Sequence, residues 1–352
     1  MSWKGVIENY RQYLPVNEKT QVVTLLEGNT PLIPVPRFVD AIGGRFQLYI
    51  KLEALNPTGS FKDRGMTMAM TAAKTRGAEI VVCASTGNTS AAAAAYAARA
   101  GMKAAVVLPH GKIAMGKLAQ ALIYGSRIVP IEGNFDDALN MVRALGEQPR
   151  VEIVNSINPQ RIEGQKTASF EICDVLGRAP DFHFIPVGNA GNITAYWKGF
   201  KEYHANGKVK TLPKMMGWQA AGSAPIVDNR VVEHPETVAT AIRIGNPASW
   251  QQAVAAQQDS GGRIGKVSDE EILQAYQLIA AKEGIFVEPA SASSLAGVIK
   301  AHQAGLIPQD SILTATLTGN GLKDPDTAIS VSEKLMKPVK PSLQAVLEVI
   351  QG

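Results

Sequence analysis

The residue of this sequence best suited to covalent chemistry is Lys62, which lies at the start of a predicted helix. It follows a turn-forming run, residues 57–59, and Ser60, whose hydroxyl can cap a helix. Residues 61–74 contain few helix breakers and end before Gly77, so we expect Lys62 in the first helical turn. The free N–H groups of that turn and burial would both lower the pKa of Lys62, and a neutral amine can attack an aldehyde. Taken alone, the motif also fits a solvated surface lysine.

A second loop, residues 85–90, gathers hydroxyl and amide side chains directly after a predicted strand. Its sequence is Ser-Thr-Gly-Asn-Thr-Ser, and it opens an alanine-rich helix. The hydroxyls, the amide and the free N–H groups of the helix start suit a carboxylate or a phosphate. A well-capped helix without a ligand is the alternative interpretation.

A third loop, Gly188-Asn189-Ala190-Gly191-Asn192, joins the predicted strand 182–187 to a predicted helix at 193–203. Its glycines permit close backbone approach, so successive N–H groups can surround an anion. The loop lacks the Lys-Ser/Thr pair of a P-loop and does not match GxGxxG. We therefore expect a phosphate on a ligand smaller than a dinucleotide, or else a simple turn.

A fourth loop, residues 316–322, places hydroxyl and amide groups after the strand that begins at Ile312. The run 288–294 resembles another helix start, which we interpret as an N-cap followed by proline. A lysine able to form a Schiff base, a loop for a small phosphate, and polar loops at strand ends are together what pyridoxal 5′-phosphate requires.

The elements that position these loops alternate between apolar strands and helices. Continuous apolar strands separated by helices are typical of parallel sheets covered on both faces, so the fold class is α/β. Ligands of such sheets bind beyond the carboxyl ends of the strands. We group the strands into a first set between residues 46 and 155 and a second set from residue 182 onward. The predicted strands are 46–50, 80–83, 104–108, 126–129, 151–154, 182–187 and 312–317.

Composition excludes several classes of protein. The 352 residues carry a net charge of only +4, without a Lys/Arg block, so we expect no nucleic-acid partner. No apolar run is long enough to span a membrane and the first residues lack a signal-peptide pattern, so we expect a cytoplasmic protein. Cys83 and Cys173 lie in separate apolar stretches without a CxxC or His-rich neighbour, which indicates buried free thiols and no metal site.

The order of these motifs resembles the threonine synthase family among the fold-type II pyridoxal-phosphate enzymes. The resemblance extends over nearly the whole chain, and the Gly-Asn-Ala-Gly-Asn loop differs from the tetraglycine loop of the related dehydratases. It implies two doubly wound domains of tryptophan-synthase-β-like architecture, with the cofactor at their interface. The implied domains are a smaller one at 50–155 and a larger one formed by 1–49 plus 156–352. Further matching segments are 155–167, 242–250 and 288–291.

The resemblance also implies the cofactor contacts. Lys62 would form the internal aldimine and later carry protons, and Asn88 would hydrogen-bond the pyridoxal 3′-oxygen. Thr318 would meet the pyridine nitrogen with a neutral hydroxyl, which does not enforce a protonated ring as a carboxylate would. The cofactor phosphate would be held by Gly188, Asn189, Ala190, Gly191 and Asn192.

The implied substrate is O-phospho-L-homoserine, and the implied enzyme is a carbon-oxygen lyase that acts as a homodimer. Phosphate would be eliminated from Cγ and water added at Cβ, which gives L-threonine. Arg161 offers bidentate contacts to phosphate. The expected substrate contacts are Ser85, Thr86 and Thr89 for the carboxylate, and Asn155, Ser156 and Arg161 for the phosphate, with Lys117 as a further candidate.

Two other functions remain open. A serine/threonine dehydratase of the same fold would use the same lysine on a substrate with a β-hydroxyl, but it would have no distal phosphate for Arg161 to neutralise. A non-catalytic protein that binds a phosphate-bearing ligand is more remote, because mere binding does not need the amine of Lys62.

Overall fold

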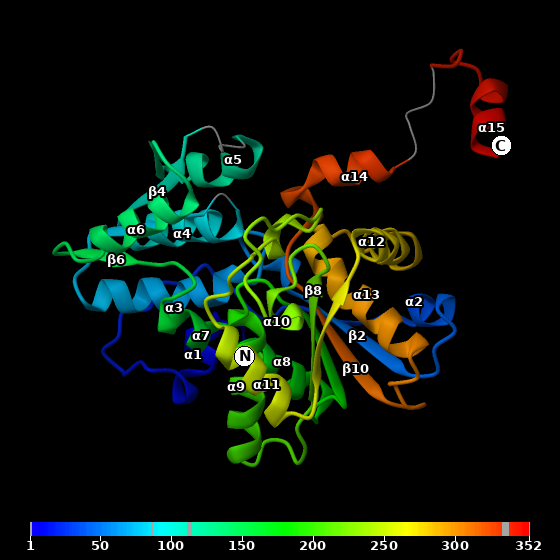
Figure 1. Ribbon diagram of the computed structural model, residues 1–352, viewed down its shortest axis with the longest axis horizontal. Coiled ribbons are helices and arrows are strands. Elements are labelled where there is room, and N and C mark those ends of the chain that lie inside the picture. Colours follow the sequence, from blue (N-terminus) through cyan, green and yellow to red (C-terminus); the bar gives the residue numbers. More distant parts are fainter. Residues whose placement is uncertain (1, 86, 111–114, 333–337, 352) are drawn as a thin grey trace.

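Two parallel sheets, each covered by helices on both faces, form the protein. The computed structural model describes residues 2–85, 87–110, 115–332 and 338–351 (Figure 1). The expected α/β class is therefore confirmed. None of the helices in these ranges combines the length and the apolar character needed to cross a membrane.

The larger sheet has six strands in the order β1-β2-β10-β7-β8-β9. Only the pairing of β1 with β2 is antiparallel. The carboxyl ends of the other strands therefore meet at one edge of the sheet. The strands are β1 (Leu32–Pro34), β2 (Gln47–Leu52), β7 (Phe182–Pro186), β8 (Lys214–Ala220), β9 (Arg263–Val267) and β10 (Ile312–Leu317).

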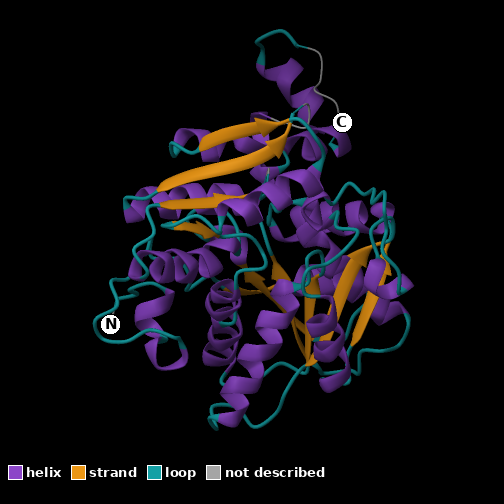
Figure 2. Ribbon diagram, turned by 60° about the vertical axis from the view of Figure 1, so that its left-hand side comes forward, coloured by secondary structure: helices purple, strands orange, loops and turns teal. Residues whose placement is uncertain are grey.

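The smaller sheet has four parallel strands in the order β5-β4-β3-β6. It lies apart from the larger sheet, with helices between the two (Figure 2). The strands are β3 (Ile80–Cys83), β4 (Lys103–Pro109), β5 (Arg127–Ile131) and β6 (Val151–Ile153).

The helices cover the sheets through apolar faces. In the larger sheet, α8, α9 and α11 bury one face, and α2, α12 and α13 bury the other. In the smaller sheet, α3, α4 and α5 bury one face and α6 the other. The α-helices are α1 (Val6–Asn9), α2 (Pro36–Ala41), α3 (Lys62–Thr75), α4 (Asn88–Ala100), α5 (Met115–Ile123), α6 (Phe135–Leu145), α7 (Pro159–Gln165), α8 (Thr167–Leu176), α9 (Gly191–Ala205), α10 (Pro225–Asp228), α11 (Trp250–Asp259), α12 (Asp269–Glu283), α13 (Pro289–Gln303), α14 (Pro325–Val331) and α15 (Leu343–Gln351). The short 3₁₀ helices are η1 (Arg11–Tyr13), η2 (Glu53–Leu55), η3 (Thr240–Ile242) and η4 (Gly321–Lys323).

The predicted strands correspond to observed strands, but their grouping is wrong at one position. The strand near residues 46–50 is β2, which pairs with β10 in the larger sheet instead of joining the strands that follow it. Strands β1, β8 and β9 are additional to the prediction. The division into 50–155 and the remainder stays a proposal. Cys83 and Cys173 are buried free thiols, as expected, and burial raises the pKa of each to about 12.

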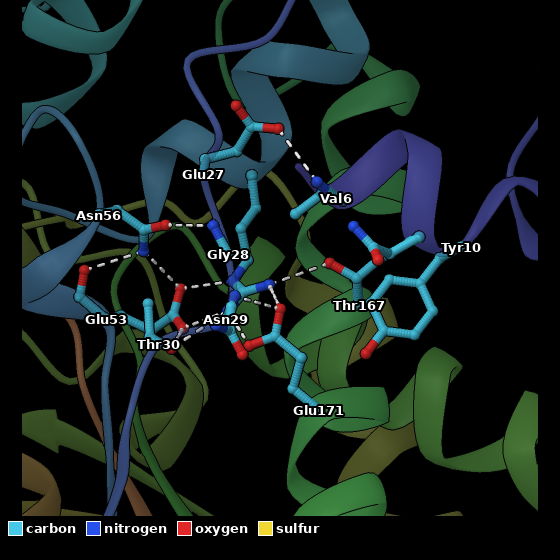
Figure 3. A network of polar contacts seen from close by, with 12 residues as sticks. Val6, Tyr10, Glu27, Gly28, Asn29, Thr30, Glu53, Asn56, Thr167 and Glu171 are labelled. Atoms are coloured by element: carbon cyan, nitrogen blue, oxygen red, sulfur yellow. Dashed lines mark hydrogen bonds and ion pairs between the residues drawn. The ribbon is translucent and has the colours of Figure 1, made fainter. Parts of the chain in front are cut away.

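A buried network of charges fixes α3 to the larger sheet (Figure 3). The guanidinium of Arg64 forms ion pairs with Glu53 at 2.7 Å and with Glu171 at 2.6 Å. Lys51 donates to the second oxygen of Glu171, also at 2.6 Å. Thr30 donates to Glu53 at 2.7 Å. The charges of Lys51 and Arg64 thus neutralise those of Glu53 and Glu171. Arg64 is two residues along the chain from Lys62.

We expect Glu171→Ala to destabilise the fold by about 3–5 kcal/mol, because it leaves Lys51 and Arg64 buried without that carboxylate. Urea unfolding followed by circular dichroism measures the loss. The control is Glu152→Ala, which breaks the partly exposed pair with Arg76 and should cost at most about 1 kcal/mol. Equal losses in the two variants would contradict a structural role for the network.

Candidate active site

Lys62 is the first residue of α3, as predicted, but its helix is capped differently. The N-cap residue is Phe61, whereas Ser60 Oγ accepts a hydrogen bond from the Lys62 backbone N–H at 3.3 Å. The side chain of Lys62 is half-buried, and its Nζ lies 4.2 Å from the centre of the Phe61 ring. Burial, and then the charge of Arg161, lower the pKa of Lys62 to about 7, while Glu288 acts in the opposite direction. The amine is therefore poised to be neutral near physiological pH.

The end of β10 adjoins this lysine. Phe61 N–H donates to the carbonyl of Thr318 at 2.9 Å, and Ser60 forms a β-bridge with Gly319. The hydroxyl of Thr318 is buried and lies 2.9 Å from Ser291 Oγ. The predicted lysine and threonine are thus brought together, although 256 positions separate them in the chain (318 − 62).

The loop after β3 enters the same region through Asn88, the first residue of α4. The Asn88 side chain is buried, and its Nδ2 lies 3.1 and 3.2 Å from the two carboxylate oxygens of Glu288. Gly87 N–H donates to Ser85 Oγ at 3.3 Å, so the Ser85 hydroxyl is used partly within its own loop. Thr89 is buried. Thr86 lies outside the described residues.

The loop between β7 and α9 has the backbone expected of an anion-binding turn. Ala190 has a φ of 64°, which is a left-handed conformation unusual for a residue other than glycine. A Cβ at Gly188 would lie 3.0 Å from Ile242 Cα, so this position has little room for a side chain. Both polar atoms of the Asn192 amide are buried at the start of α9 and have no hydrogen-bond partner in the described part of the chain. The unsatisfied Nδ2 at this helix start can donate to a phosphate bound there.

The predicted substrate-phosphate contacts other than Arg161 are Asn155, Ser156 and Lys117, and the first two already have hydrogen-bond partners. Asn155 follows β6, and its amide pairs with both backbone groups of Ala84, at 3.0 and 3.2 Å. Its side chain thereby holds the start of the 85–90 loop. Ser156 Oγ accepts from Asn189 Nδ2 at 3.3 Å, which connects it to the Gly188–Asn192 loop. Lys117 belongs to α5, but its side chain lies outside the described part of the structure.

Arg161 is a buried cation without an ion-pair partner among the described residues. It lies on α7 with 1% of its surface exposed, and the hydrogen bond of its side chain within the described ranges, from Nη1 to Val154 O, is long at 3.4 Å. Its Nε has no partner among the described residues. Burial lowers the pKa of Arg161 to about 10. A buried guanidinium is energetically unfavourable until an anion pairs with it, and a phosphate can accept hydrogen bonds from two of its N–H groups at once.

Close packing of α3 against α7 sets the position of Arg161 relative to Lys62. A Cβ at Gly65 would lie 3.0 Å from Arg161 O, and one at Gly164 would collide with the backbone of Arg64. Only glycine allows the two helices to approach so closely. The amine of Lys62 and the guanidinium of Arg161 are therefore carried by two helices in backbone contact.

Glu288 is the site residue that sequence reasoning missed. We interpreted the run 288–294 only as a helix start, whereas the Glu288 carboxylate contacts Asn88 and Thr318. A glutamate before proline at a helix start gives no indication of this contact, because the partners come from distant loops. The one indication in the sequence that Glu288 belongs to the site is its position in segment 288–291, which is part of the family resemblance.

A fold with two doubly wound sheets, a lysine with a lowered pKa, and the unsatisfied buried groups of Arg161 and Asn192 are typical of one class of cofactor enzyme. Residues 23–319 match the family described as "Pyridoxal-phosphate dependent enzyme". The chain belongs to this family.

Relatives within the family carry a more specific name. The chain is 59% identical to threonine synthase of Synechocystis over 345 residues, which cover 98% of this chain and 90% of the relative. It is 53% identical to threonine synthase of Methanocaldococcus jannaschii over 337 residues, 93% of this chain and 83% of the relative. Among solved structures, threonine deaminase isoform 2 of Solanum lycopersicum superposes with a TM-score of 0.75 at 20% identity, covering 93% of this chain and 95% of that one. That structural likeness supports the expected fold-type II architecture.

Proposed function

We propose that this protein is a threonine synthase, which converts O-phospho-L-homoserine and water to L-threonine and phosphate. The observation that carries the proposal is the buried guanidinium of Arg161, which has no ion-pair partner among the described residues and whose charge acts on Lys62. A substrate that bears a distal phosphate supplies the missing anion, whereas a β-hydroxy amino acid does not. The relatives named threonine synthase support the same assignment.

The residues present fit pyridoxal 5′-phosphate. Lys62 would hold it covalently, the Asn192 amide and the backbone of residues 188–191 would take its phosphate, and Asn88 and Thr318 would meet its ring substituents. When bound, the cofactor supplies an electron sink that stabilises negative charge next to the substrate amine. The 3.3 Å contact between Asn189 and Ser156 joins the two segments proposed to bind phosphate, which supports a substrate phosphate close to the cofactor.

The chain itself supplies proton transfer and charge neutralisation. The Lys62 amine, with its lowered pKa, would take the proton from Cα, give it up to the bound cofactor, take a second proton from Cβ, and return protons to Cγ and Cα as threonine forms. Arg161 neutralises the phosphate as it departs from Cγ. Water then adds at Cβ, and retained phosphate can act as the base that activates it. Ser85, Thr86 and Thr89 are proposed for the substrate carboxylate, and Asn155, Ser156 and Lys117 as further phosphate contacts.

The product assay tests the function directly. Incubation of the purified protein with O-phospho-L-homoserine should release phosphate and threonine in equal amounts, measured by a phosphate assay and by chromatography. Formation of 2-oxobutyrate from threonine at a higher kcat/KM would instead identify a dehydratase. Binding of the substrate without turnover would identify a non-catalytic protein.

We further propose that the protein acts as a cytoplasmic homodimer and divides into domains at 50–155 and at 1–49 plus 156–352. The family resemblance supports the dimer, and the buried free thiols suit a reducing compartment. All strands of the smaller sheet fall between residues 80 and 153, within the smaller proposed domain.

A further inference from the structure

Glu288 occupies the N-cap position of α13 without using its side chain as a cap. No side-chain hydrogen bond to the helix start is formed, although the backbone conformation is that of an N-cap. Instead, Glu288 N–H donates to Gly319 O at 2.9 Å, and its carboxylate contacts Asn88 and Thr318 of the candidate active site. Since the usual capping role is absent, the carboxylate requires another explanation.

The carboxylate of Glu288 lies between the two side chains proposed to contact the cofactor ring. It accepts from Asn88 Nδ2 at 3.1 and 3.2 Å and from Thr318 Oγ1 at 3.4 Å. The residue is 4% exposed. A Cβ at position 319 would lie 2.5 Å from the Glu288 carboxyl group, so Gly319 leaves room for it. The carboxylate is therefore held in a built site at the junction of three segments.

The groups around the Glu288 carboxylate indicate which residues its charge affects. Burial raises the pKa of Glu288, while the Asn88 hydrogen bond and the charges of Lys323 and Lys62 favour the ionised form. The side chain forms no ion pair within the described ranges, so its charge acts on these neighbours through space. At Lys62, the negative charge of Glu288 opposes the positive charge of Arg161.

The contact of both carboxylate oxygens with Asn88 Nδ2 also decides how Asn88 presents its amide. A carboxylate only accepts hydrogen bonds, so it selects the orientation in which the NH₂ group of Asn88 faces it. One N–H of that group is used by Glu288, and the second remains available as a donor. A donor is what an anionic 3′-oxygen on the cofactor ring requires.

We propose that Glu288 is a positioning residue of the cofactor site, which orients the amide of Asn88 and offsets the charge of Arg161 at Lys62. This inference rests on the proposed cofactor contacts of Asn88 and Lys62. It does not depend on the identity of the substrate.

The test compares Glu288→Gln with the wild type in two measurements without substrate. Apoprotein is titrated with pyridoxal 5′-phosphate to obtain its affinity, and the visible band of the loaded protein is followed against pH. We expect the affinity to fall about tenfold, because the charge-assisted hydrogen bond that orients Asn88 is weakened. We expect the midpoint of the band to fall by about one pH unit, because a negative charge near the nitrogen of Lys62 is lost. A residue that only stabilised the fold would not move this midpoint.

The matched control is Glu271→Gln. Glu271 lies in the first turn of α12, which packs against α13, and it is far from the start of α13 where Glu288 lies. Glu271 pairs with Lys300, near the end of α13, and touches none of the residues proposed for the cofactor. We expect wild-type affinity and midpoint for this variant. Unchanged values in Glu288→Gln would overturn the inference.

Two further variants separate the possible failures. If Asn88→Ala weakens cofactor binding and Glu288→Gln does not, the positioning role is wrong and the Asn88 contact stands. If Asn88→Ala binds the cofactor as the wild type does, the proposed Asn88 contact is wrong and the role of Glu288 falls with it.

Should Glu288→Gln fail to fold, Glu288→Asp keeps the charge and shortens the side chain. It should then retain the midpoint and lose affinity several-fold, and unchanged affinity would overturn the inference.

Discussion

Lys62→Ala is expected to lose covalent attachment of pyridoxal 5′-phosphate and to lower threonine formation by at least about 10³-fold. The substitution removes both the amine that anchors the cofactor and the group that moves protons at Cα and Cβ, and acid–base catalysis alone contributes about 10²–10⁴-fold. Borohydride reduction followed by mass spectrometry should place the cofactor on Lys62 in the wild type and nowhere in the variant. The control is Lys74→Ala, near the exposed end of the same helix, which should retain the label and the activity.

The lowered pKa of Lys62 adds a pH dependence to this result. An amine reacts when it is neutral, so capture of the cofactor by apoprotein should become faster as pH rises. The rate should be half-maximal near pH 7, because the pKa of Lys62 is about 7. A half-maximal rate above pH 9 would show that the amine is solvated like an ordinary lysine.

Arg161→Met is expected to abolish most of the affinity for the phosphate-bearing substrate while leaving the cofactor bound. Truncating one partner of a buried, hydrogen-bonded charge pair costs about 2–5 kcal/mol, which corresponds to a KM increase of about 30-fold to several thousand-fold. Steady-state kinetics with O-phospho-L-homoserine measures the change. The visible absorbance of the bound cofactor reports whether its own site remains intact.

Arg161→Met should keep or increase the stability of the fold, although it weakens substrate binding. The guanidinium of Arg161 is buried without an ion-pair partner in the described residues, so an apolar side chain of similar length should keep or raise the melting temperature. Arg263→Met, on the exposed start of β9, serves as the control and should change neither KM nor stability. Loss of the cofactor from Arg161→Met would show that this arginine serves the cofactor phosphate instead.

Local sequence patterns were sufficient for the elements that carry the site. The start of α3, the glycine-containing turn after β7 and the polar ends of β3 and β10 depend on turn chemistry and strand propensity, which neighbouring residues determine. Strand β8 was missed because its residues, from Lys214 to Ala220, include no β-branched side chain. Tertiary packing, and not local propensity, accounts for this strand. Gly217 is packed so tightly that a Cβ there would lie 2.8 Å from the Val187 side chain and 2.9 Å from that of Ile193.

The contacts between distant loops could not be predicted from the sequence. The proposed phosphate contact of Asn155 does not indicate that its amide also pairs with the backbone of Ala84. Glu288 was interpreted as a cap, and its carboxylate contacts Asn88, 200 positions away. Such contacts depend on how the two sheets are placed relative to each other, and that placement leaves no periodic signal in the chain.

The charge network around Arg64 has a consequence for the order in which the protein matures. Arg64 meets Glu171 across 107 positions, and Lys51 meets it across 120, so the network cannot close before residue 171 of the 352 has been synthesised. Contacts of such long range are slow to form, and each buried charge is unfavourable until its partners arrive. The start of α3, which carries Lys62, is therefore fixed only once the segment that carries Glu171 has folded against it.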